Sequence, residues 1–383
     1  MKSGFLIFFR LLGATYFCSR GTPGRLTLKR FCVMSAFLPI LFMVQLMHWV
    51  GFLLDDIFFR GYRNIEVKEP LFIVGIPRSG TTLLQRVVAG DTERFTSFTL
   101  WELLFAPSII ERKFWLGLGK LDRLIGKPGA RLIAFIERNA FAQLDAIHRI
   151  SLKAPEEDYF VLVPILACFI LILPFPFSQE LWRIAYFDQA MPQKDKQRIM
   201  AFYKACLQRH LYVRGAEKQL LSKNPSFSGM IESLDETFPD CKIVGCIRDP
   251  LEAIPSLISS MMSGARIFDN DPQGHGFRDQ LLEMLKYFYE HLTHQLPKMP
   301  DERHAFVTLN ELKERLGDTV RQIYDKLGWT MSPAFQTFLQ MEDERARKYS
   351  SKHKYTLEMF ELEPDDISRE FAYVYERFDF DVA

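Results

Sequence analysis

Acidic residues are absent from the first 54 positions of this 383-residue chain, in which Asp55 is the first acid. The same stretch carries six basic residues, Lys2, Arg10, Arg20, Arg25, Lys29 and Arg30. Over the whole chain the charges nearly cancel, leaving a formal net charge of +1 at pH 7. Because no strong overall field would draw the chain to nucleic acid, the sequence predicts no nucleic-acid partner.

Cysteine pairs at metal-ligand spacing are also absent. The six cysteines are scattered, no CxxC pair occurs, and no group of cysteines and histidines has the spacing of a zinc site. We therefore expect no bound metal. Cys241 and Cys246 flank an apolar run and are expected to be small core residues. Nothing in the sequence indicates an oligomeric state.

Charged residues are absent from the run at 31–54, which is apolar apart from a serine, a glutamine and a histidine. Its length suits a helix that crosses a bilayer, which needs about 20 residues. Basic residues precede it and Asp55 and Asp56 follow it, so the amino terminus is predicted to stay in the cytosol. The chain would then be a single-pass, type II-like membrane protein, in the secretory pathway (Golgi) of a eukaryote or the inner membrane of a bacterium. The alternatives are a helix lying in the membrane surface and a buried hairpin on the globular domain.

Two further apolar runs are less suited to crossing a membrane. The run at 159–177 contains Pro164, Pro174 and Pro176, so we expect a buried or interfacial helix there. The run at 5–17 is interrupted by Arg10 and predicts an interfacial helix, with a cleaved targeting peptide as the alternative.

The clearest nucleotide-binding pattern in the sequence lacks the lysine that nucleoside triphosphatases carry. Residues 71–74 form an apolar run typical of a buried parallel strand, and a turn from Gly75 to Gly80 leads into helical spacing. Such a strand, loop and helix direct backbone N–H groups and the positive end of a helix at phosphate. The spacing matches the P-loop pattern, but Thr81 occupies the lysine position that a kinase or ATPase needs.

Arg78 supplies a cation inside this loop, and a guanidinium can bind two phosphate or sulfate oxygens. The segment GIPRSGTTLL resembles the 5′-phosphosulfate loop of sulfotransferases that use 3′-phosphoadenosine 5′-phosphosulfate (PAPS), especially the bacterial-type and tyrosylprotein branch. The resemblance implies transfer of a sulfuryl group from PAPS to an acceptor hydroxyl. It also implies a set of residues that bind the co-substrate, namely Arg78, Ser79, Gly80, Thr81 and Thr82.

A second strand-and-helix pattern lies at 241–260. Residues 242–247 predict a buried strand, Asp249 is placed to cap the next helix, and Pro250 suits its first turn. The resemblance implies that Arg248 and Ser256 bind the 3′-phosphate of the nucleotide.

Lys223 follows a third predicted strand around 220–221. A similar segment precedes the 3′-phosphate strand in the family, so Lys223 is a candidate for contact with the nucleotide or the transferring sulfate. The alternative is a solvated surface lysine. Because open α/β sheets bind ligands at the carboxyl ends of their strands, we expect Arg78, Lys223 and Arg248 to lie together.

Transfer to a hydroxyl also needs a base that accepts the acceptor's proton. Glu102 is our first candidate, since a catalytic glutamate lies in a comparable segment of the tyrosylprotein and related bacterial enzymes. Its apolar neighbours would raise the pKa of its carboxyl group. The competing candidates are Glu157, in the acidic stretch at 156–158, and His148. The basic residues Lys352, His353 and Lys354 near the carboxyl end are candidates for nucleotide or acceptor contact, or form a solvated charge run.

Together these segments predict an α/β fold. A basic segment and membrane anchor at 1–65 would precede a P-loop-like, three-layer domain at 66–383 with a short, mostly parallel sheet. Helices inserted at 92–217 would build the acceptor side. The acceptor is left open between a small molecule, a lipid or other hydrophobic alcohol, a glycan and a protein. The rival functions are a P-loop nucleotide kinase or other NTP-binding enzyme, and an inactive membrane protein that retains the fold.

Overall fold

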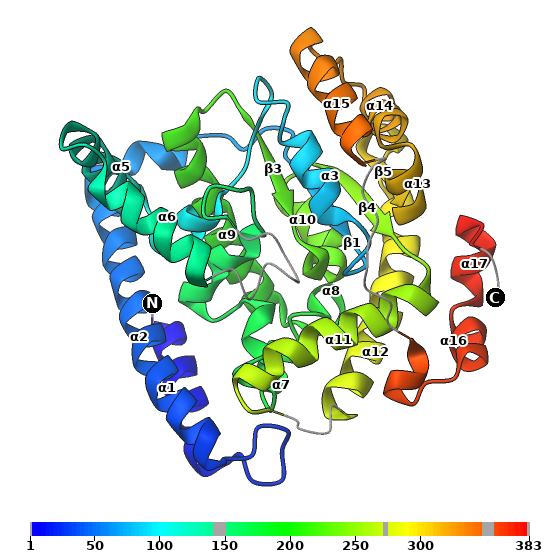
Figure 1. Cartoon of the computed structure of the whole chain (residues 1–383), viewed down its shortest axis with the longest axis horizontal. Helices are drawn as coiled ribbons and strands as arrows, with labels where there is room; N and C mark the ends of the chain where they lie inside the picture. Colours follow the sequence, from blue (N-terminus) through cyan, green and yellow to red (C-terminus); the bar gives the residue numbers. More distant parts are fainter. Residues whose placement is uncertain (1, 141–150, 271–274, 347–355, 381–383) are drawn as a thin grey trace.

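A sheet of five parallel strands forms the centre of the computed structural model of the chain (Figure 1). The structure describes residues 2–140, 151–270, 275–346 and 356–380. The strands lie side by side in the order β2-β3-β1-β4-β5, which confirms the expected short parallel sheet. Their bounds are β1 Leu71–Gly75, β2 Phe95–Thr96, β3 Gln219–Lys223, β4 Lys242–Ile247 and β5 His304–Thr308.

Helices cover both faces of the sheet, because successive side chains of a strand point to opposite faces. Phe72 and Val74 of β1 belong to a core with α9, α10, α11 and α12, whereas Leu71 and Ile73 belong to a second core with α3, α13, α14 and α15. The expected three-layer α/β fold is confirmed. These helices are α9 Gln193–Arg214, α10 Ile231–Thr237, α11 Pro250–Ile267, α12 His275–Gln295, α3 Thr81–Val88, α13 Leu309–Glu314, α14 Leu316–Lys326 and α15 Pro333–Ala346.

Further helices lie outside these two layers. Five of them fall between β1 and β3 and two near the carboxyl end of the chain (Figure 1). They are α4 Leu100–Phe105, α5 Ile109–Leu124, α6 Pro128–Ala140, α7 Gln179–Trp182, α8 Phe187–Ala190, α16 Pro364–Glu370 and α17 Ala372–Phe378.

The strand ends lie where the sequence pattern predicts them. β4 covers the predicted residues, and Asp249 caps α11 by accepting a hydrogen bond from the backbone N–H of Leu251 (2.9 Å). Lys223 is the last residue of β3. Cys241 and Cys246 are completely buried, as expected for small core residues.

The apolar run at 159–177 is mostly buried, but it does not form the predicted helix. It folds into two short 3-10 helices, Asp158–Ile165 and Phe169–Ile172, joined by irregular chain. Pro164, Pro174 and Pro176 lack backbone N–H groups, so a continuous helix would lose hydrogen bonds at each of them.

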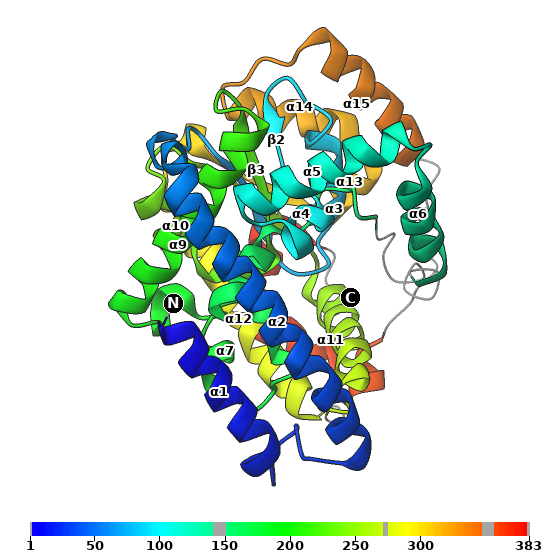
Figure 2. The same ribbon diagram turned by 90° about the vertical axis from the view of Figure 1, so that its left-hand side faces the viewer.

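Two apolar helices precede the sheet, α1 Lys2–Phe17 and α2 Leu28–Phe58. Among the described residues, α2 alone is a helix long and apolar enough to cross a membrane. It runs along the outside of the domain, with α1 beside it (Figure 2). One face of α2 is buried at helical spacing, from Met34 through Leu38 and Leu41 to Phe52. The amino-terminal helices therefore share the hydrophobic core of the domain.

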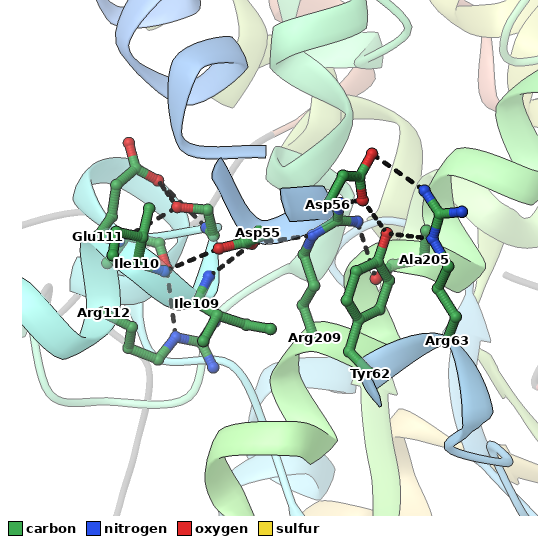
Figure 3. Close-up of polar contacts among 12 residues, drawn as sticks. Asp55, Asp56, Tyr62, Arg63, Ile109, Ile110, Glu111, Arg112, Ala205 and Arg209 are labelled. Atoms are coloured by element: carbon green, nitrogen blue, oxygen red, sulfur yellow. Dashed lines mark hydrogen bonds and ion pairs between the residues drawn. The ribbon is translucent and has the colours of Figure 1, made fainter. Parts of the chain in front are cut away.

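The carboxyl end of α2 is joined to the domain by a buried ion pair (Figure 3). The carboxylate of Asp55 accepts hydrogen bonds from the backbone N–H groups of Ile109 (2.8 Å) and Ile110 (2.9 Å). These groups form the positive end of α5, where a negative charge is stabilised. The same carboxylate accepts a hydrogen bond from Arg209 Nε (3.0 Å) on α9, while Arg209 Nη2 contacts the more exposed Asp56 (3.1 Å).

We expect Asp55→Ala to lower the free energy of unfolding by about 3 kcal/mol, because it leaves the buried charge of Arg209 and two N–H groups of α5 without this acceptor. Asp56→Ala is the matched control, since it removes a partly exposed acid from the same arginine and should cost about 1 kcal/mol or less. Denaturant unfolding of the two variants checks the difference. Equal losses of unfolding free energy in the two variants would contradict the conclusion that Asp55 stabilises this contact more than Asp56 does.

Candidate functional site

Three residues from the last position of β1 to the start of α3 have positive φ angles, namely Gly75, Arg78 and Gly80. Gly75 (φ 147°) passes so close to β4 that a Cβ atom there would lie 2.3 Å from the carbonyl oxygen of Cys246. Gly80 (φ 87°) precedes α3, and Arg78 has a φ of 71° although it is not glycine. A non-glycine residue in the left-handed region stores about 1–3 kcal/mol of strain, and such strain is found mainly at functional sites.

The structure brings the two predicted nucleotide elements together. Arg78 Nε donates a hydrogen bond to Ser256 Oγ (3.2 Å) of α11, and Arg248 Nη1 donates one to the carbonyl oxygen of Arg78 (3.1 Å). Arg248, which lies between β4 and α11, also pairs with Glu252 (2.9 Å) in the first turn of α11. Two guanidinium groups and one hydroxyl therefore gather at the carboxyl edge of the sheet.

A cavity of about 400 Å³ opens beside this loop. One part of its lining is polar and comes from Arg78, Gly80, Thr81, Thr82 and Glu157. The other part is apolar and comes from the buried 159–177 segment, α11 and α12, including Phe169, Ile170, Leu257, Met261, Met284 and Phe288. The Oγ atom of the buried Ser79 has no hydrogen-bond partner within the described part of the protein.

Lys223 lies at this edge as predicted, and it is not a solvated surface lysine. Its side chain is only 1% exposed, and its Nζ lies 2.8 Å from Glu157 and 3.8 Å from Glu156. Glu157 retains 25% exposure and reaches the cavity lining. The ion pair therefore joins a carboxylate of the cavity lining to an ammonium group that is buried and does not itself line the cavity.

The neighbouring Asp158 belongs to the same acidic stretch that competed with Glu102 for the role of base, and in the structure it forms a buried network beside this pair. Its buried carboxylate accepts hydrogen bonds from Tyr203 Oη (2.6 Å) and Ser222 Oγ (2.8 Å) and from the side-chain amide of Asn224. These contacts tie the residues on either side of Lys223 to the residue after Glu157. Burial raises the pKa of Asp158 to about 6, against the lowering effect of these hydrogen bonds.

Glu102 lies away from the cavity lining, contrary to the role expected for it. It is completely buried and closes a capping box at the start of α4, accepting hydrogen bonds from the backbone N–H (2.9 Å) and hydroxyl (2.8 Å) of Thr99. Its other oxygen lies 2.7 Å from Arg214 and 3.7 Å from Arg112. The spacing of Thr99 and Glu102 is itself the sequence signature of a capping box, a signal that could have indicated this structural position.

The remaining candidates for the base and for basic contacts with a ligand lie in segments that the structure does not describe. His148, Lys352, His353 and Lys354 lie outside the described residues. Within the described ranges, no group of three or more histidine, cysteine, aspartate or glutamate residues is arranged to hold a metal ion.

A sequence model of the sulfotransferase family matches residues 70–333, well over half of the chain. The chain belongs to the sulfotransferase family. This sulfotransferase is 27% identical over 301 residues to the omega-hydroxy-beta-dihydromenaquinone-9 sulfotransferases Stf3 of Mycobacterium bovis and Mycobacterium tuberculosis. The alignment covers 77% of this chain and 70% of each relative.

Solved structures of sulfotransferases share the fold of this sulfotransferase. STF9 from Mycobacterium avium has a TM-score of 0.68 at 18% identity, over 93% of this chain and 87% of that one. STF1 from Mycobacterium tuberculosis has a TM-score of 0.64 at 18% identity, over 97% of this chain and 93% of that one. At this identity the likeness establishes the common fold.

We expect Asp158→Asn to flatten the pH dependence of stability of this sulfotransferase between about pH 4 and pH 6. Because the folded state raises the pKa of Asp158 from 3.8 to about 6, it binds the proton more tightly than the unfolded chain. The contribution of this group to stability therefore falls by about 3 kcal/mol as the pH rises through that window. Unfolding free energies measured across the window check this. The exposed Asp365→Asn is the control, and a wild-type slope in Asp158→Asn would contradict a buried, titrating Asp158.

Proposed function

We propose that this sulfotransferase transfers the sulfuryl group of PAPS to the hydroxyl of a lipid or other hydrophobic alcohol. One observation supports this proposal above all. A loop of the phosphate-binding type lines one part of the cavity, and apolar side chains line the other part. The family implies PAPS as the sulfuryl donor. A donor with charged phosphate and sulfate groups suits the first part, and an apolar acceptor suits the second.

The residues of the loop fit the two charged ends of PAPS. In our proposal, Arg78, Thr81, Thr82, the hydroxyl of Ser79 and the backbone N–H group of Gly80 bind the 5′-phosphosulfate. The buried hydroxyl of Ser79 has no hydrogen-bond partner among the described residues and is available as a donor, whereas the backbone N–H of Ser79 donates to the carbonyl oxygen of Ile76 (3.1 Å). Arg248 and Ser256 would bind the 3′-phosphate, which is supported by their contacts with Arg78.

We assign the base to Glu157, in place of Glu102, because Glu157 lines the cavity. Its carboxylate accepts the proton of the acceptor hydroxyl while the acceptor oxygen forms a bond to sulfur. The bond from sulfur to the bridging phosphate oxygen breaks, and adenosine 3′,5′-bisphosphate leaves with that electron pair. Lys223 and Arg78 stabilise the negative charge that develops around the transferring group and on the leaving oxygen.

The apolar part of the cavity supports an apolar acceptor. Its side chains come from the 159–177 segment and from the consecutive helices α11 and α12, which lie far from that segment in the sequence, so the shape is set by packing. The relatives Stf3 are named for action on a hydroxylated menaquinone derivative, an acceptor of the same general character. Among the acceptor classes left open by the sequence, a lipid alcohol therefore agrees best with the site.

We expect Glu157→Gln to lower kcat by about 10²–10⁴-fold while adenosine 3′,5′-bisphosphate still binds, because only proton acceptance is removed. The measurement is transfer of labelled sulfate to a membrane lipid extract, together with nucleotide binding. Glu102→Gln is the matched control. Because Glu102 is part of a helix cap, the folded fraction of this variant should keep the turnover of the wild type. Undiminished transfer by Glu157→Gln would remove Glu157 as the base.

We expect Arg78→Ala to abolish retention on immobilised adenosine 3′,5′-bisphosphate, because the loop loses its guanidinium. Arg321→Ala, at a half-exposed surface arginine, should bind as the wild type does. The wild type should be stabilised against heat by adenosine 3′,5′-bisphosphate and not by ATP with magnesium. Stabilisation by ATP with magnesium alone would favour the NTP-binding alternative.

A further inference from the structure

We propose that α1, α2, α5 and α6 form one apolar surface that inserts into a single leaflet of an anionic lipid bilayer, with α2 lying in the membrane plane instead of crossing it. This apolar surface is made of exposed side chains of the four helices, among them Phe9, Ile40, Met43, Val50, Phe114 and Leu132. The proposal does not depend on the proposed function.

Exposed large apolar side chains are concentrated in the first 135 residues. Beyond them, within the described ranges, such side chains are exposed only at Tyr212, Ile267, Met341 and Met359. The four helices of the apolar surface lie on the side of the molecule that faces the viewer in Figure 2. They are also continuous, because α1 packs on α2, α2 on α5, and α5 on α6. An exposed apolar surface of this extent marks a site of interaction with a membrane or a protein.

The opposite face of α2 is attached to the domain by polar contacts along its whole length. In the first turn the buried Arg30 donates a hydrogen bond to the carbonyl oxygen of Pro174 (2.8 Å). In the middle, Gln45 and His48 make buried hydrogen bonds with the domain. In the last turn Asp55 forms the ion pair shown in Figure 3. At about 1.5 Å per residue, these contacts extend along about 38 Å of helix.

A helix held in this way has no free stretch that can cross a membrane. The hydrocarbon core of a bilayer is about 30 Å thick, so a crossing α2 would carry the attached domain into the lipid. Buried charges such as Arg30 and Asp55 would then have to leave their partners, which is costly. Of the alternatives left open by the sequence, a helix in the membrane surface keeps these contacts and also covers the exposed apolar side chains.

The charges of the amino-terminal segment point to anionic lipid as the partner. No acid occurs before Asp55, and Arg20 and Arg25 are exposed in the segment between α1 and α2. Arg10 and Lys29 are also exposed, although each pairs with an acid of the domain. Basic residues beside an exposed apolar face are typical of helices that lie in the interface of an anionic membrane.

The topology is tested with a membrane-impermeant thiol reagent on sealed membranes that carry the full chain. In a background with Cys18→Ser and Cys32→Ser, which removes the exposed cysteines, Arg20→Cys reports on the segment before α2 and Glu358→Cys reports on the domain. We expect both positions to react from the same side of the membrane. Reaction from opposite sides would show that α2 crosses the bilayer and would overturn the proposal.

The surface itself is tested by flotation with vesicles of phosphatidylethanolamine and phosphatidylglycerol. Met43 lies on the apolar surface at 61% exposure, and Met359 lies outside it at 62% exposure. We expect Met43→Glu to bind vesicles at least about tenfold more weakly than the wild type and Met359→Glu to bind equally well. Equal binding by both variants would overturn the proposal. Conversion of a dimer to a monomer by Met43→Glu, with unchanged flotation, would instead assign the surface to a second copy of the chain.

Discussion

The site depends on the close parallel pairing of β1 with β3 and β4. The register places Ile73 beside Lys223 and Gly75 beside Cys246. The three adjacent strands β3, β1 and β4 therefore end at the same edge of the sheet. Only glycine fits at position 75, because a Cβ atom would meet the backbone of β4. A wider separation of β1 and β4 would also separate Arg78 from the end of β4, where Arg248 follows. The spacing of two strands thus determines whether the two arginines can act on one ligand.

The two glutamates considered for the base lie in different surroundings. Glu102 caps a helix and faces two arginines in a completely buried setting, where its oxygens are occupied by protein donors. Glu157 faces one lysine and the cavity, so part of its carboxylate is accessible to a ligand. Asp158 stabilises this arrangement by binding the residues on both sides of Lys223. A buried polar network of this kind favours one geometry over alternatives, because every unmade contact in it is costly.

Buried polar contacts also fix the position of the amino-terminal helices, for which we propose contact with a membrane. α2 is apolar enough for lipid, yet its inner face carries Arg30, which donates a hydrogen bond to a carbonyl oxygen of the domain, and Asp55, which pairs with Arg209. The apolar character alone could not distinguish a helix across a bilayer from one lying on it. In our proposal the buried polar contacts make the distinction, because they attach the helix to the domain from its first turn to its last.

The local elements and the residue types of the Gly75–Gly80 loop could be predicted from the amino-acid sequence. The strand at 71–74, the Asp249 cap and the presence of Arg78 in a glycine loop follow from short-range patterns of hydrophobicity and backbone preference. Which glutamate reaches the cavity, and which face of α2 is buried, became evident only from the folded chain. Those outcomes depend on contacts between segments far apart in the chain, such as Asp55 with Arg209 and Glu157 with Lys223, which no local pattern encodes.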